Sequence, residues 1–186
     1  MGKLLAEDPL QVARNHSVPN SVFHMRNQPV GPSHPLYDHP MDLHYRVSGS
    51  GTWYLLAAGP FTKELEIYDQ FNARDDVSRV RLFQDIMAVI ESLGLCEYLL
   101  LFLNLEDISS IISPILGVNL EPRTLVQLGA KVSDAERQLN LEMDRDQTLL
   151  SMGPSWSSET KNEKILKYFS MRNWDERGVP KNKIEL

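Results

Sequence analysis

The sequence predicts a mainly α-helical domain with a loop-rich N-terminal third, and two observations lead to this fold class. From Asp75 onward, apolar residues recur at spacings of three and four, which is the period of amphipathic helices. Residues 1–60 instead contain all five histidines and seven of the eleven prolines, without a sustained period. We therefore expect a single domain over residues 1–186, with a loop-rich segment and a short helix in 1–60 and a helical core in 61–186.

Length and charge narrow the class of protein. A chain of 186 residues is about one domain long and can bury a hydrophobic core. The net charge of -6 argues against a broad phosphate-binding surface, so we expect no nucleic-acid partner. The longest apolar run, Tyr98–Leu103, is far shorter than the roughly 20 residues that cross a bilayer, and the N-terminus lacks a sustained signal-peptide core. We expect a cytoplasmic protein that does not enter membranes.

The N-terminal third begins with a helix start. Asp8 is placed as an N-cap, and Pro9 follows at the first helical position, where its missing N–H costs nothing. After about Asn15 the sequence no longer shows a helical pattern. Three X-Pro pairs between residues 31 and 40 bias the backbone away from helix, so we expect an extended connection there.

The first long helix is predicted from Asp75 to Gly94. Its apolar stripe consists of Val77, Val80, Phe83, Ile86, Met87 and Ile90. Gly94 can adopt the left-handed conformation that closes a helix, and Leu95 can fold back onto the preceding turn. Cys96, the only cysteine of the chain, therefore follows a helix cap.

Three more helices are predicted downstream. One starts near Glu106 and stops before Gly117, one runs from about Pro122 through Leu139, and one is capped by Ser157 or Ser158. The shared face of the second of these contains Leu125, Leu128, Val132, Ala135 and Leu139, and the apolar residues of the last are Ile165, Leu166, Phe169 and Met171.

The segment Glu91–Glu97 has two interpretations. On the residues alone it is a glycine-capped helix end, and Cys96 is a small buried apolar residue. The same segment, ESLGLCE, also resembles the Asp-x-x-Gly-Leu-Cys/Asp-x motif of the tungsten-containing aldehyde ferredoxin oxidoreductases. That resemblance implies that Glu91, Gly94 and Leu95 line a pterin cofactor and that Cys96 is a ligand of a [4Fe-4S] cluster.

Three further stretches resemble the C-terminal domain of this family in co-linear order. Residues 2–7 are similar to its Gly-x-Leu-Leu-Ala-Glu-Gly segment, although Asp8 replaces the last glycine. Leu116–Leu120, with Gly129 and Asn140 downstream, is similar to its Thr-Gly-x-x-Leu and Arg-x-x-Asn-Leu stretch. Tyr168–Pro180 resembles its terminal Tyr-Tyr-x-x-Arg-Gly-Trp-Asp-x-x-Gly-Val-Pro signature. The resemblance implies that the chain is a C-terminal helical domain of such an enzyme.

The terminal signature needs no active-site role. Trp174 can fill the core, while Gly178 and Pro180 can shape the turn after the last helix, so we interpret the signature as packing.

Two departures from the family pattern concern site residues. Glu91 stands where the motif usually has Asp, which moves the carboxylate out by one methylene. The Ser48–Tyr54 stretch aligns with the family's Arg-Gly-x-x-His region and places Tyr54 at the histidine position. A tyrosine with a pKa of about 10 is a poor proton acceptor at neutral pH. No catalytic residue is identified in the sequence.

The largest departure is the shortage of thiolates, because a [4Fe-4S] cluster takes four and this chain has one cysteine. In the family, the other three come from a Cys-x-x-Cys-x-x-x-Cys run in an upstream domain. The resemblance thus implies a second polypeptide that carries this run and the pterin-binding segment. It further implies a shared tungstopterin or molybdopterin, oxidation of aldehydes to carboxylates, and ferredoxin as the electron acceptor.

Two alternatives stay open. The chain can be a non-catalytic helical remnant or interaction domain, which would expose apolar surface, with Leu99–Leu103 as the candidate. A hydrolase that pairs Cys96 with a histidine is weaker, because no nucleophile motif is present and every histidine lies more than fifty residues upstream.

The histidines carry no ligand pattern of their own. His16, His24, His34, His39 and His44 match no compact metal-site spacing, so we interpret them as solvated loop residues.

Overall fold

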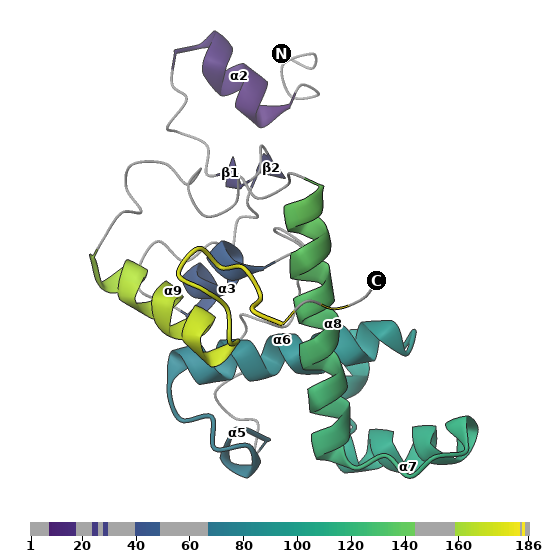
Figure 1. The fold of residues 1–186 in the computed structure, drawn as a ribbon. Coiled ribbons are helices and arrows are strands. Elements are labelled where there is room, and N and C mark those ends of the chain that lie inside the picture. Colours follow the sequence, from purple (N-terminus) through teal and green to yellow (C-terminus); the bar gives the residue numbers. More distant parts are fainter. Residues whose placement is uncertain are drawn as a thin grey trace.

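The computed structural model describes residues 8–17, 24–25, 28–29, 40–48, 67–143, 159–182 and 184. Its elements are, in order, α2 (Pro9–Asn15), β1 (His24–Met25), β2 (Gln28–Pro29), α3 (Pro40–Val47), α5 (Ile67–Gln70), α6 (Asp76–Ser92), the 3-10 helix η2 (Glu97–Leu101), α7 (Leu105–Leu116), α8 (Pro122–Glu142) and α9 (Glu159–Met171), as drawn in Figure 1. The two short strands pair antiparallel. The predicted mainly α-helical class is confirmed.

Capping chemistry sets the helix boundaries that the sequence predicted. The Asp75 carboxylate accepts the amides of Val77 and Ser78 at 3.0 and 3.1 Å, and the Ser78 hydroxyl accepts the Asp75 amide at 3.2 Å. Asn104 and Asp107 form the same reciprocal capping box at the start of α7. Each box satisfies amides that would otherwise lack a partner in the first turn.

The central contact of the fold is the crossing of α6 and α8, which run across one another in Figure 1. At the crossing point, a Cβ atom placed on Gly129 would lie 1.7 Å from the backbone oxygen of Asp85. The absence of a side chain on Gly129 therefore allows the two backbones to approach at this point.

Two hydrophobic clusters share α6. One is built around Ile90, Leu105, Ile108 and Leu125, each at most 1% exposed, and joins the C-terminal half of α6 to α7 and α8. The other is made of Leu43, Val47, Val77, Val80, Ile165, Tyr168, Phe169 and Trp174, and joins the N-terminal half of α6 to α3 and α9. Helix α6 thus connects both halves of the core.

The shared apolar face predicted for α8 is only partly buried. Of its five apolar residues, Leu125 is fully buried, whereas Leu128, Val132 and Leu139 are 40%, 38% and 46% exposed. The buried residues are instead Leu125, Gly129, Arg137 and Asn140. The reason is the close crossing, which turns the glycine face of α8 toward α6 and leaves the apolar face about 100° away around the helix.

The C-terminal signature packs as expected. Trp174 is 4% exposed and forms an isolated antiparallel bridge with Pro180, and Gly178 has a φ of +74° between them. A Cβ on Gly178 would approach a ring carbon of Phe169 to 2.7 Å, so the turn also packs tightly on α9.

Other expectations have mixed outcomes. Asp8 accepts the first helical hydrogen bond of α2 with its backbone oxygen, as predicted. Of the four apolar residues named for α9, Ile165, Phe169 and Met171 belong to or pack on the core, whereas Leu166 is 49% exposed. Residues 2–7, Tyr54, Ser157 and Ser158 lie outside the described residues. Among the helices described, none is long and apolar enough to cross a membrane.

Replacing Gly129 with alanine should destabilise the protein by at least about 2 kcal/mol, because the new methyl group collides with backbone rather than with a movable side chain. Urea unfolding followed by circular dichroism measures the change. Lys131→Ala, an exposed change on the same helix, is the control and should stay within about 0.5 kcal/mol of wild type. Equal stability of Gly129→Ala and wild type would contradict the close crossing.

Candidate cofactor site and buried polar network

The segment Glu91–Glu97 is held by a Schellman motif at the end of α6. The Leu95 amide donates to the Ile90 carbonyl at 3.1 Å, and the Gly94 amide donates to the Glu91 carbonyl at 2.9 Å. Gly94 has a φ of +67°, and a Cβ there would meet no atom within 4 Å. Its requirement for glycine is therefore conformational and not steric. The predicted helix end is confirmed.

Cys96 is exposed, so the interpretation of this residue as a buried apolar side chain is wrong. Its neighbours explain the exposure. Leu95 and Leu100 pack against the α6–α7–α8 hydrophobic cluster, and Cys96 caps η2 between them, with its carbonyl accepting the Leu99 amide at 3.0 Å. The leucines take the interior positions, and the thiol is left at the surface.

Glu91 lies in the last turn of α6 and borders a cleft that Glu97 also lines. Partial burial raises the pKa of the Glu91 carboxyl, and the negative charge of Glu97 raises it further. His44, Gln84 and Tyr168 form the inner part of the same cleft. Two acidic side chains thus line one cleft near the end of α6, close in sequence to Cys96.

The cleft has a volume of about 70 Å³. Pockets for organic cofactors usually measure roughly 300–1,000 Å³, so this cleft alone has room for a few waters and not for a pterin. Within the residues that the structure describes, no group of three or more His, Cys, Asp or Glu side chains is placed to hold a metal ion. Cys96, the one thiol of the chain, is not among the residues that line this cleft.

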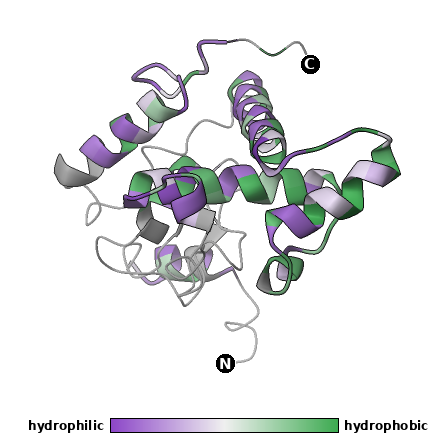
Figure 2. Ribbon diagram, turned by 90° about the horizontal axis from the view of Figure 1, so that it is seen from below, coloured by the Kyte–Doolittle hydropathy of each residue, from purple (hydrophilic) through white to green (hydrophobic). Residues whose placement is uncertain are grey.

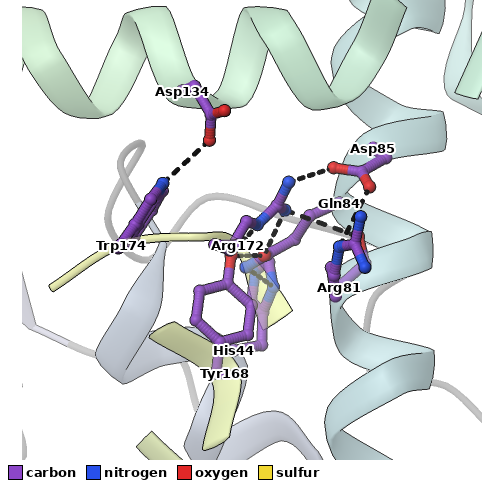
Figure 3. A network of polar contacts seen from close by, with 8 residues as sticks. All are labelled: His44, Arg81, Gln84, Asp85, Asp134, Tyr168, Arg172 and Trp174. Carbon is purple, nitrogen blue, oxygen red and sulfur yellow. Dashed lines mark hydrogen bonds and ion pairs between the residues drawn. The ribbon is translucent and has the colours of Figure 1, made fainter. Parts of the chain in front are cut away.

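A buried polar network lies behind the cleft and centres on Arg172 (Figure 3). One guanidinium nitrogen pairs with the carboxylate of Asp85, and both side chains are 2% exposed. The Arg172 Nε donates to the Tyr168 oxygen at 2.9 Å, and its Nη2 donates to Gln84 Oε1 at 3.2 Å. Tyr168 donates to the same Gln84 oxygen, and Gln84 Nε2 contacts His44 Nδ1 at 3.1 Å. The network links α3, α6 and α9.

The donor directions in the network fix the state of His44. Arginine can only donate, so the Gln84 oxygen must face Arg172 and its NH₂ group must face His44. His44 Nδ1 is then the acceptor and carries no proton. Burial lowers the pKa of His44 to about 4, and a second proton on the ring would point at the Gln84 amide donor. His44 is buried and neutral, so the expectation of a solvated loop residue is wrong for it.

Burial has different consequences for the charges of Asp85 and Arg172, the ion pair at the centre of the network. Burial raises the pKa of Asp85, and the nearby Arg172 counteracts this only in part. Burial opposes the charge of Arg172, but Tyr168 and Asp85 outweigh it and hold the arginine pKa above its usual value. The guanidinium therefore stays charged and remains the fixed donor of the network.

The C-terminal turn is tied to α8 by two further contacts. The Arg137 Nε donates to the Gly178 carbonyl at 2.8 Å. The Trp174 indole donates to Asp134 at 2.9 Å, a contact that Figure 3 shows. The C-terminal turn and the close-packed α6–α8 pair are thereby joined into one unit.

Sequence reasoning missed this network, although signals for it were present. Asp85 interrupts the apolar stripe of α6 between Phe83 and Ile86, which is a position where a charge needs a partner. Arg172 follows Tyr168 by four residues, so the two can share a helix face.

The described residues thus form a mainly helical domain with an exposed thiol just after a capped helix end and a small cleft that Glu91 and Glu97 help to line. The profile for "Aldehyde ferredoxin oxidoreductase, domains 2 & 3" matches residues 1–184. The chain belongs to the aldehyde ferredoxin oxidoreductase family, which confirms the resemblance found in the sequence.

Curated relatives carry the same family name. The "tungsten-containing aldehyde ferredoxin oxidoreductase" of Pyrococcus furiosus is 30% identical over 125 residues, which cover 60% of this chain and 21% of the relative. Proteins of the same name from Thermococcus kodakarensis and Pyrococcus horikoshii are 27% and 28% identical over the same lengths. The chain thus spans about a fifth of the length of the relatives it matches.

Removing one partner of the buried ion pair should be costly. Arg172→Met leaves Asp85 buried with only the longer contact to Arg81 at 3.8 Å, so we expect a loss of about 3–5 kcal/mol in the free energy of unfolding. The double variant Arg172→Met with Asp85→Leu removes both charges and should recover more than half of the loss. Urea unfolding of the three proteins measures this, and equal single and double losses would contradict a paired charge.

Stability should depend on pH through His44. Above pH 6.5 the ring is neutral in both states, but between pH 6.5 and about 4 only the unfolded chain binds the proton. The free energy of unfolding should therefore fall by about 3 kcal/mol as the pH is lowered from 6.5 to about 4. His44→Gln, which keeps an acceptor for Gln84, should lose this component. Asp85 contributes with the opposite sign in both proteins, so its contribution cancels in the difference between the wild-type and His44→Gln curves of unfolding free energy against pH. Identical curves would show that His44 is not buried and neutral.

Proposed function

We propose that the chain is the C-terminal part of a tungsten or molybdenum pterin aldehyde ferredoxin oxidoreductase and completes its cofactor site together with another polypeptide. In this role Cys96 is one ligand of a [4Fe-4S] cluster, and Glu91, Gly94 and Leu95 line the pterin. The observation that carries the proposal is the exposed Cys96 thiol on the rigid, capped end of α6.

The single cysteine of this chain fits a cluster site that two polypeptides share better than a cluster site that this chain builds alone. A [4Fe-4S] cluster takes four thiolates, and this chain has a single cysteine. An exposed thiol can be reached by a cluster that is held mainly by another chain. The position of Cys96 just after a Schellman motif also restrains its backbone, which suits a ligand that must meet a preformed group.

The roles of the pterin-lining residues follow from their local structure. Leu95 packs its side chain on the core, so it would face the pterin with its backbone. The raised pKa of Glu91 lets its carboxyl keep a proton at higher pH than a free glutamate, and a protonated carboxyl can donate to a cofactor acceptor. The bound cofactor would supply the oxidation of an aldehyde and water to a carboxylic acid, with two electrons and two protons released.

The proposed partners follow from the fraction of the family that this chain covers. Relatives named tungsten-containing aldehyde ferredoxin oxidoreductase are about five times as long as the matched segment. A companion polypeptide would supply the pterin-binding segment and the Cys-x-x-Cys-x-x-x-Cys run. Ferredoxin would accept the electrons, one per molecule.

The alternative is a non-catalytic helical remnant or interaction domain without a cofactor. Its supporting observation is the partly exposed apolar run after Cys96, where Phe102 is 81% and Tyr98 is 43% exposed. Both proposals expect an exposed apolar face, and only the first expects metal bound in the assembly.

Metal and iron-sulfur content of the protein purified without oxygen from its native host tests the proposal. Wild type should co-purify with a second chain, iron and tungsten or molybdenum, and Cys96→Ser should lose or alter the cluster while the fold is kept. Ser170→Ala, an exposed change on α9, is the control and should match wild type. A wild-type protein free of metal and of any companion would overturn the proposal and leave the remnant.

A further inference from the structure

Helix α8 has an apolar stripe that the described part of the chain leaves exposed. It consists of Leu128, Val132 and Leu139, with the partly exposed Ala135 between them, at spacings of four, three and four. This is the spacing of one continuous face over about three helical turns. We call these four residues the α8 stripe.

Neither hydrophobic cluster of the described residues includes the α8 stripe. The adjacent face of α8 already packs on α6 at Gly129, and Arg137 on that face donates to the Gly178 carbonyl. Residues one position apart lie about 100° apart around a helix, so α8 cannot turn the stripe inward without breaking this contact.

The size of the α8 stripe indicates the kind of contact it makes. Four partly exposed side chains offer a few hundred Å² of apolar surface, whereas a stable interface takes about 800 Å² from each partner. The stripe by itself is therefore too small to hold two copies of this chain together. It suits one section of a wider contact, and Phe102 and Ile115, 81% and 71% exposed, lie on the segment and helix that precede α8. Hydrophobic residues extend to the far end of α7 in Figure 2.

Chain length points to the occupant. The match covers 21% of the Pyrococcus furiosus relative, so nearly four-fifths of that protein lies outside the part that corresponds to this chain. In that relative, a large remainder of the protein is available to cover the apolar faces of the matched part. We propose that the α8 stripe is the docking surface for the polypeptide that carries the pterin-binding segment of the family. This inference rests on the proposed function and adds the surface through which the companion binds.

Affinity purification from the native host tests the docking surface. Tagged wild type is compared with Leu128→Glu/Val132→Glu and with a matched control, Leu166→Glu/Ser170→Glu, which adds the same two charges to exposed positions of α9. Wild type and control should retain a chain that mass spectrometry identifies by its Cys-x-x-Cys-x-x-x-Cys run. The stripe variant should retain at most about a tenth as much, because two buried charges oppose docking. Circular dichroism establishes that each variant is folded, and Leu128→Gln replaces the double variant if it is not.

The other outcomes separate this inference from the proposed function. If the stripe variant retains the companion and the metals as wild type does, the docking surface is wrong and the proposed function stands. If wild type carries neither companion nor metal, both fail. Self-association of wild type that the stripe variant loses would assign the stripe to a second copy and overturn the proposal. A photoreactive group placed at Val132 that crosslinks only to other residues of the same chain would also overturn the proposal.

Discussion

Asp85 is the residue on which the described structure depends, because three helices meet at it. Its backbone oxygen lies where α8 crosses α6 at Gly129, and its carboxylate pairs with Arg172 from the residue after α9. The first contact depends on the absence of a side chain, and the second depends on a charge that is removed from water. Both are sensitive to single substitutions, and neither can shift without moving α6.

The geometry of the candidate site follows from this anchoring. Helix α6 is fixed near its middle by Asp85 and belongs to both hydrophobic clusters, so its C-terminal turn is not free to swing. The Schellman motif then fixes the direction of the chain beyond Gly94, and Leu95 anchors it to the core. The exposed Cys96 is thus a surface thiol on a rigid support, unlike a thiol on a long loop. The polar network to His44 stabilises the wall of the cleft next to it.

Local signals predicted the long helices but not the short α3, α5 and η2, and they were insufficient for the faces of the long helices. Asp75 and Gly94 act through their immediate neighbours, and so the sequence predicts helix ends at these two residues. The inner face of α8 depends on the distant Asp85 backbone, and an apolar stripe alone cannot show that a glycine face packs more closely. The exposure of Cys96 was missed for a similar reason, because its neighbours Leu95 and Leu100 are the residues that pack against the core. The motif resemblance, in contrast, identified the family from the sequence.

The reactivity of Cys96 in the assembly purified from the native host tests the central claim most directly, since that claim is that this thiol binds a cluster. Alkylation at Cys96 is followed by mass spectrometry before and after the cluster is removed by oxidation and chelation. A cluster ligand should be protected at first and become reactive afterwards, because the isolated chain exposes it. Equal alkylation before and after removal would contradict the assignment of Cys96 as a ligand.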